Sequence, residues 1–264
     1  MRIRQRTRPE AAVGRRQACG DAAMKESVGS ANKLKSLLTA LRKKYKAAEP
    51  PAGLDPLEVL TLGILRRNAT LAEGLEGLRR LHEEFVDFNE MRVAPPKDIV
   101  DVLQKSMPDS RLKAEQLTTT LNRMFDHGIA LDLKSLAGLG KRELKEQLRS
   151  NLQLDEYGEA YLMNYVFESP VLPVDDRLAT KLKEEGYIAA DATSARIREV
   201  LEQAVPVRSR HEAFELLSQF AAEPISAKRK KADAEEAARA RKAAKPPKAA
   251  GAPRKRPAAQ KKKP

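Results

Sequence analysis

The spacing of leucines is the feature of this sequence that most restricts its fold. From residue 34 onward, large apolar residues return every three or four positions, beginning with Leu34, Leu37, Leu38 and Leu41. This period places them on one face of an α-helix, whereas a half-buried strand needs alternation at every second residue. The sequence contains no alternating run long enough for a strand. We therefore predict an all-α fold of roughly ten helices.

Gly, Pro, Asn and Asp residues separate the helical segments and predict short loops between them. The helices are expected within residues 31–48, 54–69, 71–85, 95–106, 110–128, 132–140, 141–151, 156–167, 175–186, 192–205 and 209–223.

Basic charge is concentrated at the two ends of the chain. Residues 224–264 hold 15 Lys and Arg against 3 acids, and residues 1–23 hold 6 against 2, which leaves a slightly acidic middle. Beyond residue 226 there is no large apolar side chain to bury. We predict disordered segments at 1–29 and 224–264 around a helical domain at 30–223. The tail would neutralise phosphates of double-stranded DNA through Lys228, Arg229, Lys230, Lys231, Arg254, Lys255 and Arg256.

Several classes of protein are disfavoured by composition. The single cysteine, Cys19, cannot form an internal disulfide or hold an iron–sulfur cluster, and His82, His127 and His211 lack metal-ligand spacing. No apolar run of about 18 residues predicts a membrane span, and no apolar segment follows the N-terminal arginines as in a signal peptide. We expect a monomeric cytoplasmic protein without metal or cofactor, starting at Met1 or at Met24.

The stretch "ESPVLPVDDRLATKL" is the first candidate for chemistry. Asp175 and Asp176 follow an apolar, proline-containing lead-in and precede a helical pattern. Aspartate is a preferred N-cap, because its carboxylate accepts free N–H groups of the first helical turn. A carboxylate held rigidly at that position could also act on a substrate, so both roles stay open at this point.

A second candidate is the glycine-containing turn in "SLAGLGKREL". Gly138 and Gly140 have the spacing of a helix-hairpin-helix turn, in which glycines let backbone N–H groups approach a DNA phosphate. The alternative is an ordinary glycine-rich end of a helix.

From about residue 55 to residue 220 the chain resembles the helix-hairpin-helix DNA glycosylase superfamily of endonuclease III. The similar segments are "DPLEVLTLGILRRNATLAEG", "SMPDSRLKAEQLTTTLNRM" and "AYLMNYVFESPVLPVDDRLATKL". The resemblance implies a two-lobed helical fold, here without the iron–sulfur cluster that many members carry. In that superfamily the Asp of a Val-Asp pair is the essential carboxylate, and it corresponds to Asp175. Such a carboxylate stabilises an oxocarbenium-like sugar or activates water during base removal.

An ungapped alignment to the superfamily puts Tyr157 at the position of the lysine that bifunctional members use. Tyrosine has no amine, which argues against a Schiff-base lyase step. The same alignment puts the hairpin at Gln153, Leu154 and Asp155, although Gln153 lacks the conformational freedom of glycine and Asp155 has the wrong charge for a phosphate. A gapped alternative uses Gly138–Gly140, with Arg142 at the lysine position.

The leading hypothesis is a DNA-binding, base-excision-repair protein, a monofunctional glycosylase with Asp175 at the sugar and Asn68 near the edge of a flipped base. The alternatives are a catalytically inactive architectural protein on the same fold and a helical scaffold for protein interactions. We expect association with the nucleoid. A basic surface beside Asp175 would favour DNA binding there, whereas an acidic or apolar one would favour the scaffold.

Overall fold

The computed structural model describes residues 30–48, 53–103, 107–129, 133–167, 169 and 171–225. The predicted disordered segment 1–29 and the seven basic tail residues assigned to DNA binding lie outside these residues. The chain divides into two compact units, residues 1–224 and 225–264. Only Ile225 of the second unit is described, so the account below concerns the first.

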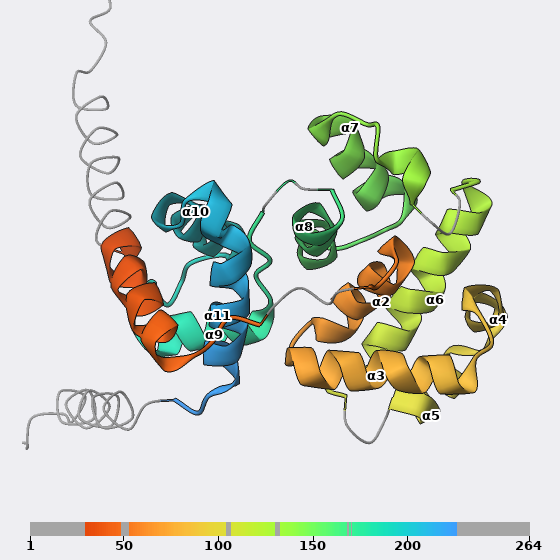
Figure 1. Ribbon diagram of the computed structural model, residues 1–264, viewed down its shortest axis with the longest axis horizontal. Helices are drawn as coiled ribbons and strands as arrows, with labels where there is room; N and C mark the ends of the chain where they lie inside the picture. Colours follow the sequence, from red (N-terminus) through yellow and green to blue (C-terminus); the bar gives the residue numbers. More distant parts are fainter. Residues whose placement is uncertain are drawn as a thin grey trace, which may run out of the picture. The chain divides into compact units, whose positions relative to one another are not determined.

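All regular structure in the described residues is helical, which confirms the all-α prediction (Figure 1). A first helix covers residues 30–44. The others are α2 (Pro56–Arg66), α3 (Leu71–Glu84), α4 (Phe88–Val93), α5 (Pro96–Leu103), α6 (Ser110–Asp126), α7 (Lys141–Glu146), α8 (Glu156–Tyr165), α9 (Asp176–Glu184), α10 (Ser194–Ala204) and α11 (Arg210–Ala222), with short 3-10 turns at Lys134–Leu136 and Val207–Ser209 and a π-helical turn, η2 (Gln147–Asn151).

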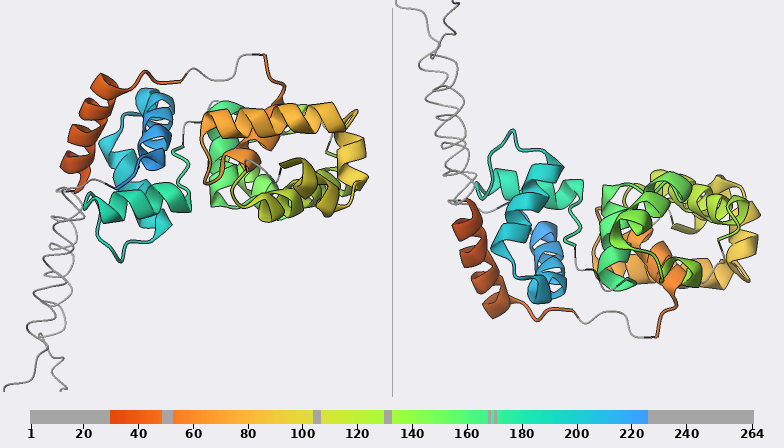
Figure 2. Two further views of the ribbon diagram at one scale, coloured as in Figure 1. Left: turned by 90° about the horizontal axis from the view of Figure 1, so that it is seen from below. Right: turned by 90° about the horizontal axis from the view of Figure 1, so that it is seen from above.

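Two hydrophobic cores account for most of the buried side chains. The first is built by α2 to α7 and by part of α8, and its leucines include Leu60, Leu81 and Leu117. The second joins the helix at 30–44 to α9, α10 and α11, so the two ends of the helical region pack together. Figures 1 and 2 show that N-terminal helix beside the C-terminal ones. Two separate cores are what a two-lobed fold requires.

Helix α2 begins at a complete capping box. The Asp55 side chain accepts hydrogen bonds from the N–H groups of Leu57 and Glu58, and the Glu58 carboxylate accepts one from the N–H of Asp55. A Cβ atom on Gly63 would lie 2.6 Å from the Tyr161 ring, so glycine allows α2 and α8 to approach closely. This contact fixes the end of α2 relative to α8.

A buried ion pair links α2 to α11. Arg66 and Glu215 are each 1% exposed, and two hydrogen bonds of 2.7 and 2.9 Å join them. Tyr165 also donates its hydroxyl to Glu215, and the guanidinium group of Arg66 lies 4.9 Å from the centre of the Phe214 ring. The pair therefore connects a helix of the first core to a helix of the second.

Candidate functional site

Asp175 is the N-cap of α9, as predicted. Its Oδ1 atom accepts the N–H of Leu178 at 2.8 Å, and its Oδ2 atom accepts the N–H of Asn68 at 2.9 Å. Burial raises the pKa of this carboxyl group, while the two N–H donors oppose that rise. The carboxylate is thus held by backbone groups from two different parts of the chain.

A role for Asp175 at the sugar of a substrate requires its carboxylate to be reached from the neighbouring cavity. The residue is half-buried and is not among those that line the neighbouring cavity, whereas Asp176 and Asn68 do line it. The reason is a hydrogen bond, because the N–H of Asn68 binds the carboxylate oxygen that is not used for capping. Access of a substrate to this oxygen requires Asn68 to give way.

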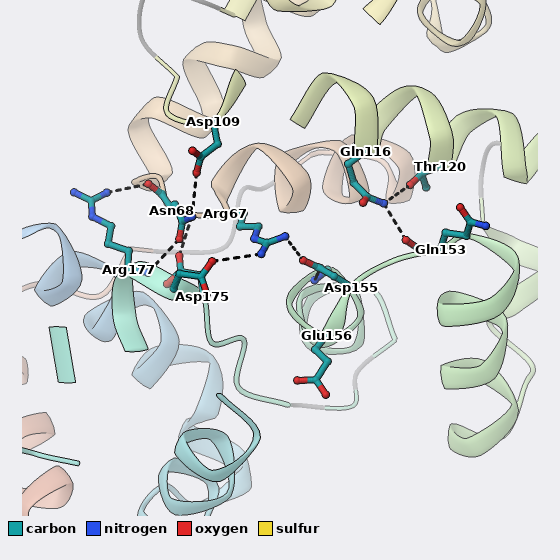
Figure 3. Close-up of polar contacts among 12 residues, drawn as sticks. Arg67, Asn68, Asp109, Gln116, Thr120, Gln153, Asp155, Glu156, Asp175 and Arg177 are labelled. Atoms are coloured by element: carbon teal, nitrogen blue, oxygen red, sulfur yellow. Dashed lines mark hydrogen bonds and ion pairs between the residues drawn. The ribbon is translucent and has the colours of Figure 1, made fainter. Parts of the chain in front are cut away.

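Asn68 connects three helix ends. Its Nδ2 group donates to Asp109 before α6, its Oδ1 atom accepts the N–H of Arg177 in α9, and its own N–H binds Asp175 (Figure 3). Asn68 directly follows the C-cap of α2 and has a left-handed φ of 56°. In this structure its side-chain amide bridges the residue before α6 and the first turn of α9, and thereby positions the site.

A cavity of about 550 Å³ lies beside these residues. This volume is in the range of small-molecule and cofactor sites. The predicted residues Asn68, Gln153, Leu154, Asp155 and Tyr157 all line it. The charged residues of its wall are the bases Arg67 and Lys113 and the acids Asp109, Glu115, Asp155 and Asp176. Acids therefore outnumber bases in the wall.

The turn at Gln153 has a backbone conformation that suits the glycine expected there in the ungapped alignment. The turn from Leu152 to Asp155 separates η2 from α8, and Gln153 in that turn has a left-handed φ of 54°. Glycine would adopt this conformation without strain, whereas glutamine pays about 1 kcal/mol. By contrast, Gly140 has a φ of −65° and Gly138 is not left-handed either, so the backbone gives no conformational reason for glycine there.

Two side chains of α6 hold the hairpin turn. Gln116 donates to the carbonyl oxygen of Gln153 at 3.1 Å, and Thr120 donates to that of Leu152 at 3.3 Å. Figure 3 shows Gln116 and Thr120 on the same side of α6 as the turn. The Thr120 bond satisfies a buried carbonyl group, and the two bonds together fix the turn relative to the cavity.

Asp155 places its own negative charge on the hairpin. One carboxylate oxygen accepts the N–H of Gly158 at 2.7 Å, and the other pairs with Arg67. An N–H group at the start of a helix is one that could otherwise bind a phosphate. In this chain the carboxylate occupies it and also engages the nearest arginine, so the hairpin is poorly suited to an anion.

We therefore expect Asp155→Asn to strengthen binding to duplex DNA. Asparagine keeps the cap but removes the charge and releases Arg67, which is worth about 1 kcal/mol or about fivefold in Kd at low salt. Fluorescence anisotropy with a labelled duplex measures the change. Glu83→Gln removes the same charge from the surface of α3 and should leave Kd within about twofold. Equal or weaker binding by Asp155→Asn would contradict this role of the hairpin.

Tyr157 is buried in the first turn of α8. It is 5% exposed and lines the cavity, and its ring lies 6.2 Å from that of Tyr161. Burial raises the pKa of its hydroxyl well above the usual value, so the side chain stays neutral. Its position supports a role in shaping the cavity, and it supplies no amine.

Lys113 was not predicted from the sequence. It is 3% exposed, lines the cavity, and has no hydrogen-bond partner for its amine among the described residues. Burial lowers its pKa to about 8, although Asp109, Glu73 and Asp175 act in the opposite direction. One signal was available: Lys113 precedes Leu117 and Leu121 at intervals of four, and therefore occupies the apolar face of α6.

Backbone strain is concentrated around the cavity. Four residues other than glycine have a left-handed φ among the described residues: Asn68, Asp109, Leu133 and Gln153. All except Leu133 line the cavity. Such strain persists only where the surrounding structure enforces it, and it gathers at functional sites. Among the described residues, no three His, Cys, Asp or Glu side chains are grouped closely enough to hold a metal ion.

Comparison with known proteins adds the fold relationship. No protein-family model and no curated protein sequence matches the chain. Among solved structures, a non-covalent endonuclease III–DNA complex matches with a TM-score of 0.57 and 16% identity, over 77% of this chain and 98% of the other. A thermostable thymine-DNA glycosylase matches with a TM-score of 0.51 and 17% identity, over 78% and 90%.

A third similar structure is the H. pylori 3-methyladenine DNA glycosylase MagIII bound to 1,N6-ethenoadenine. It matches with a TM-score of 0.52 and 14% identity, over 71% of this chain and 95% of the other. Identities this low establish the fold alone. The chain has the helical fold of these DNA glycosylases, and the resemblance predicted from its sequence is confirmed at that level.

Proposed function

We propose that this protein binds duplex DNA and hydrolyses the N-glycosidic bond of a flipped nucleotide, with Asp175 as the essential carboxylate. The observation that carries the proposal is a rigid aspartate at a helix N-terminus, beside a cavity of about 550 Å³, in a chain with a glycosylase fold. One of the similar solved structures named above is a complex with DNA. The role of Asp175 is supported by its position and by its chemistry.

Cleavage of the N-glycosidic bond is favoured by a fixed negative charge near the sugar. Loss of the base develops positive charge on the deoxyribose, and a carboxylate beside C1′ stabilises that charge or activates the attacking water. The two N–H donors hold the Asp175 carboxylate in one orientation before substrate binds. Pre-organised groups of this kind need no rearrangement as the charge develops.

The cavity would receive the extruded base. Leu154 and Tyr157 supply apolar contact area, and the side chains of Gln116 and Thr119 supply hydrogen-bonding groups in the same wall. Removing a base from the stack costs a few kcal/mol, which these contacts would offset. We further propose that the protein acts as a monomer associated with the nucleoid. No described helix is both long and apolar enough to cross a membrane.

A second candidate is a non-enzymatic protein on the same fold, which clamps DNA or binds another protein. The specific observation in its favour is the acidic wall of the cavity and the carboxylate on the hairpin. Both features repel a phosphate backbone, so they favour a protein that uses this face to bind another protein and holds DNA, if at all, through another surface. Under this alternative Asp175 would act only as a cap of α9.

The basic tail is proposed to supply the DNA affinity that the acidic cavity does not. Deletion of residues 226–264 removes a net charge of +12. If about ten phosphates are neutralised, the slope of log Kd against log salt concentration should fall by about nine units. Binding titrations of full-length and truncated protein at four salt concentrations measure it. An unchanged affinity and slope would contradict this role for the tail.

The experiment that tests the proposed function is an assay of abasic-site formation. Full-length protein is incubated with duplexes that carry deaminated, oxidised, alkylated or mismatched bases, and alkali then cleaves any abasic site formed. Excision of at least one of these bases supports the glycosylase. Tight binding without excision of any base supports the non-enzymatic candidate.

A further inference from the structure

The N-terminal helix and the short segment that follows it have an unusual balance of charge. Residues 30–48 hold six Lys and Arg and no acid, whereas residues 53–223 hold 22 Lys and Arg against 30 acids. A surface on which one sign of charge is concentrated attracts a partner of the opposite charge. This helix is therefore a candidate interaction surface in an otherwise acidic part of the chain.

The polar side of the helix at residues 30–44 is free to meet a partner. Its apolar side belongs to the second core, in which four leucines of this helix are each 5% exposed or less: Leu34, Leu37, Leu38 and Leu41. Figure 2 shows the helix at the edge of the bundle that it forms with α9, α10 and α11. Lys35 and Lys43 lie on the exposed side, about 12 Å apart along the helix axis, and Lys46 follows just beyond the helix end.

The six cations of residues 30–48 fall into two groups of three. Arg42 and Lys44 form ion pairs with Glu212 and Glu223, and the amine of Lys33 lies 3.4 Å from a backbone carbonyl oxygen. The other three are exposed, and their amines have no ion pair or hydrogen bond with any described residue: Lys35, Lys43 and Lys46. We call these three lysines the basic face.

We propose that the basic face binds the phosphate backbone of duplex DNA, at a surface separate from the cavity. None of its three lysines lines that cavity. Because acids outnumber bases in the cavity wall, the protein needs phosphate contacts from another surface, and the basic face supplies them from the folded helical region. This inference rests on the proposed function for the identity of its partner, but it requires no removal of a base.

The chemistry of the basic face favours phosphate over other anionic partners. Protein interfaces are anchored by large apolar or aromatic side chains, and none of the exposed large apolar side chains of the described residues belongs to this helix. A helix that binds a membrane inserts its apolar side, but here that side is packed in the second core. Lysines bind phosphates as point charges and need neither an apolar anchor nor a particular base sequence.

The basic tail begins shortly after a contact with the same helix. Glu223, the C-cap of α11, pairs with Lys44 and accepts the hydroxyl of Tyr45. The chain therefore enters its most basic segment, residues 226–264, only a few residues after this contact. Phosphate contacts made by the basic face and by the tail would add in the salt dependence of binding.

The test is the salt dependence of binding to an undamaged duplex. Lys35→Gln, Lys43→Gln and Lys46→Gln are combined in the full-length protein, and fluorescence anisotropy gives Kd over a range of salt concentrations. Each lost phosphate contact lowers the slope of log Kd against log salt concentration by about 0.9, so we expect a fall of about three units and, at about 0.1 M salt, a Kd at least about tenfold weaker. Glutamine has nearly the helix propensity of lysine, and circular dichroism verifies that the variant is folded.

Two control variants separate local contacts from net charge. The combination of Arg79→Gln, Arg80→Gln and Lys97→Gln removes the same charge from α3 and α5, and its slope should differ from that of the wild type by less than about one unit. Replacement of all three lysines of the basic face by arginine keeps their charge and should retain the wild-type slope.

Protection from acetylation locates the contact on the protein. With saturating duplex, the three amines of the basic face should react several-fold more slowly with an acetylating reagent than in free protein, whereas exposed Lys97 of α5 should react at the same rate. Mass spectrometry of proteolytic fragments measures both rates. Unprotected amines on the basic face would overturn the inference.

The slopes decide between the partners and between the two proposals. Equal slopes for the two glutamine variants would overturn the inference and leave the basic face to an acidic protein. Lost binding to phosphatidylserine vesicles with an unchanged DNA slope would overturn it in favour of a lipid surface. Because the duplex is undamaged, a lower slope without base excision in the separate assay would fail only the proposed glycosylase step, and excision with an unchanged slope would fail only this inference.

Discussion

Replacement of Glu215 by alanine is expected to lower the free energy of unfolding by about 3–5 kcal/mol. The substitution leaves the Arg66 guanidinium, which is 1% exposed, without the carboxylate that accepts two of its hydrogen bonds. An uncompensated buried charge is among the most destabilising changes a protein can undergo. Urea denaturation followed by circular dichroism measures the loss.

An exposed pair on the same helix provides the matched control. Glu212 of α11 pairs with Arg42 through two hydrogen bonds of 2.9 Å, but both side chains are about 40% exposed. Glu212→Ala should therefore cost about 1 kcal/mol or less. The double variant Arg66→Met, Glu215→Leu should recover most of the loss, because it removes both charges. Equal effects of Glu215→Ala and Glu212→Ala would contradict the buried pair.

Replacement of Asp175 by asparagine is expected to lower the rate of base excision about 100-fold or more. Asparagine has nearly the same shape and caps helices well, so the free energy of unfolding should change by about 1 kcal/mol or less. The two results together separate chemistry from capping. Single-turnover excision and urea denaturation of the same preparation measure them. A large loss of stability with unchanged excision would show that Asp175 acts only as a cap.

A variant of the neighbouring aspartate and the pH dependence of excision also separate catalysis from capping. Asp176 is 70% exposed at its side chain and makes only a 3.4 Å contact with Arg67, so Asp176→Asn should alter excision by about twofold or less. The proposed function requires the carboxylate form of Asp175, and burial raises the pKa of this group. Excision should therefore decline as pH falls through a value above the ordinary aspartate pKa of 3.8.

The long helices and the cap at Asp175 could be predicted because local sequence determines them. Apolar residues at intervals of three and four mark the buried face of α6 and α11, and the aspartate before a helical pattern marks the start of α9. Helix α4, with six residues, is too short to show a period and was missed. The π-helical turn η2 has no local signature either, because it depends on how the hairpin packs.

The contacts of the site depended on tertiary packing and were not predicted. Arg66 and Glu215 are 149 residues apart, and nothing local indicates that they pair. Lysine is usually an exposed residue type, although the position of Lys113 in the α6 pattern places it on the buried face. The ungapped alignment singled out Gln153, which has a left-handed φ, whereas the pairing of Asp155 with Arg67 required the fold.

The central claim is that this site removes a base from DNA. Its most direct test is single-turnover formation of abasic sites by full-length wild type and by Asp175→Asn, across duplexes with deaminated, oxidised, alkylated and mismatched bases. We expect the wild type to excise at least one base, and the Asp175→Asn rate on that duplex to be lower by about 100-fold or more. The claim would be contradicted if wild-type protein bound these duplexes and left every base in place, or if both proteins excised at the same rate.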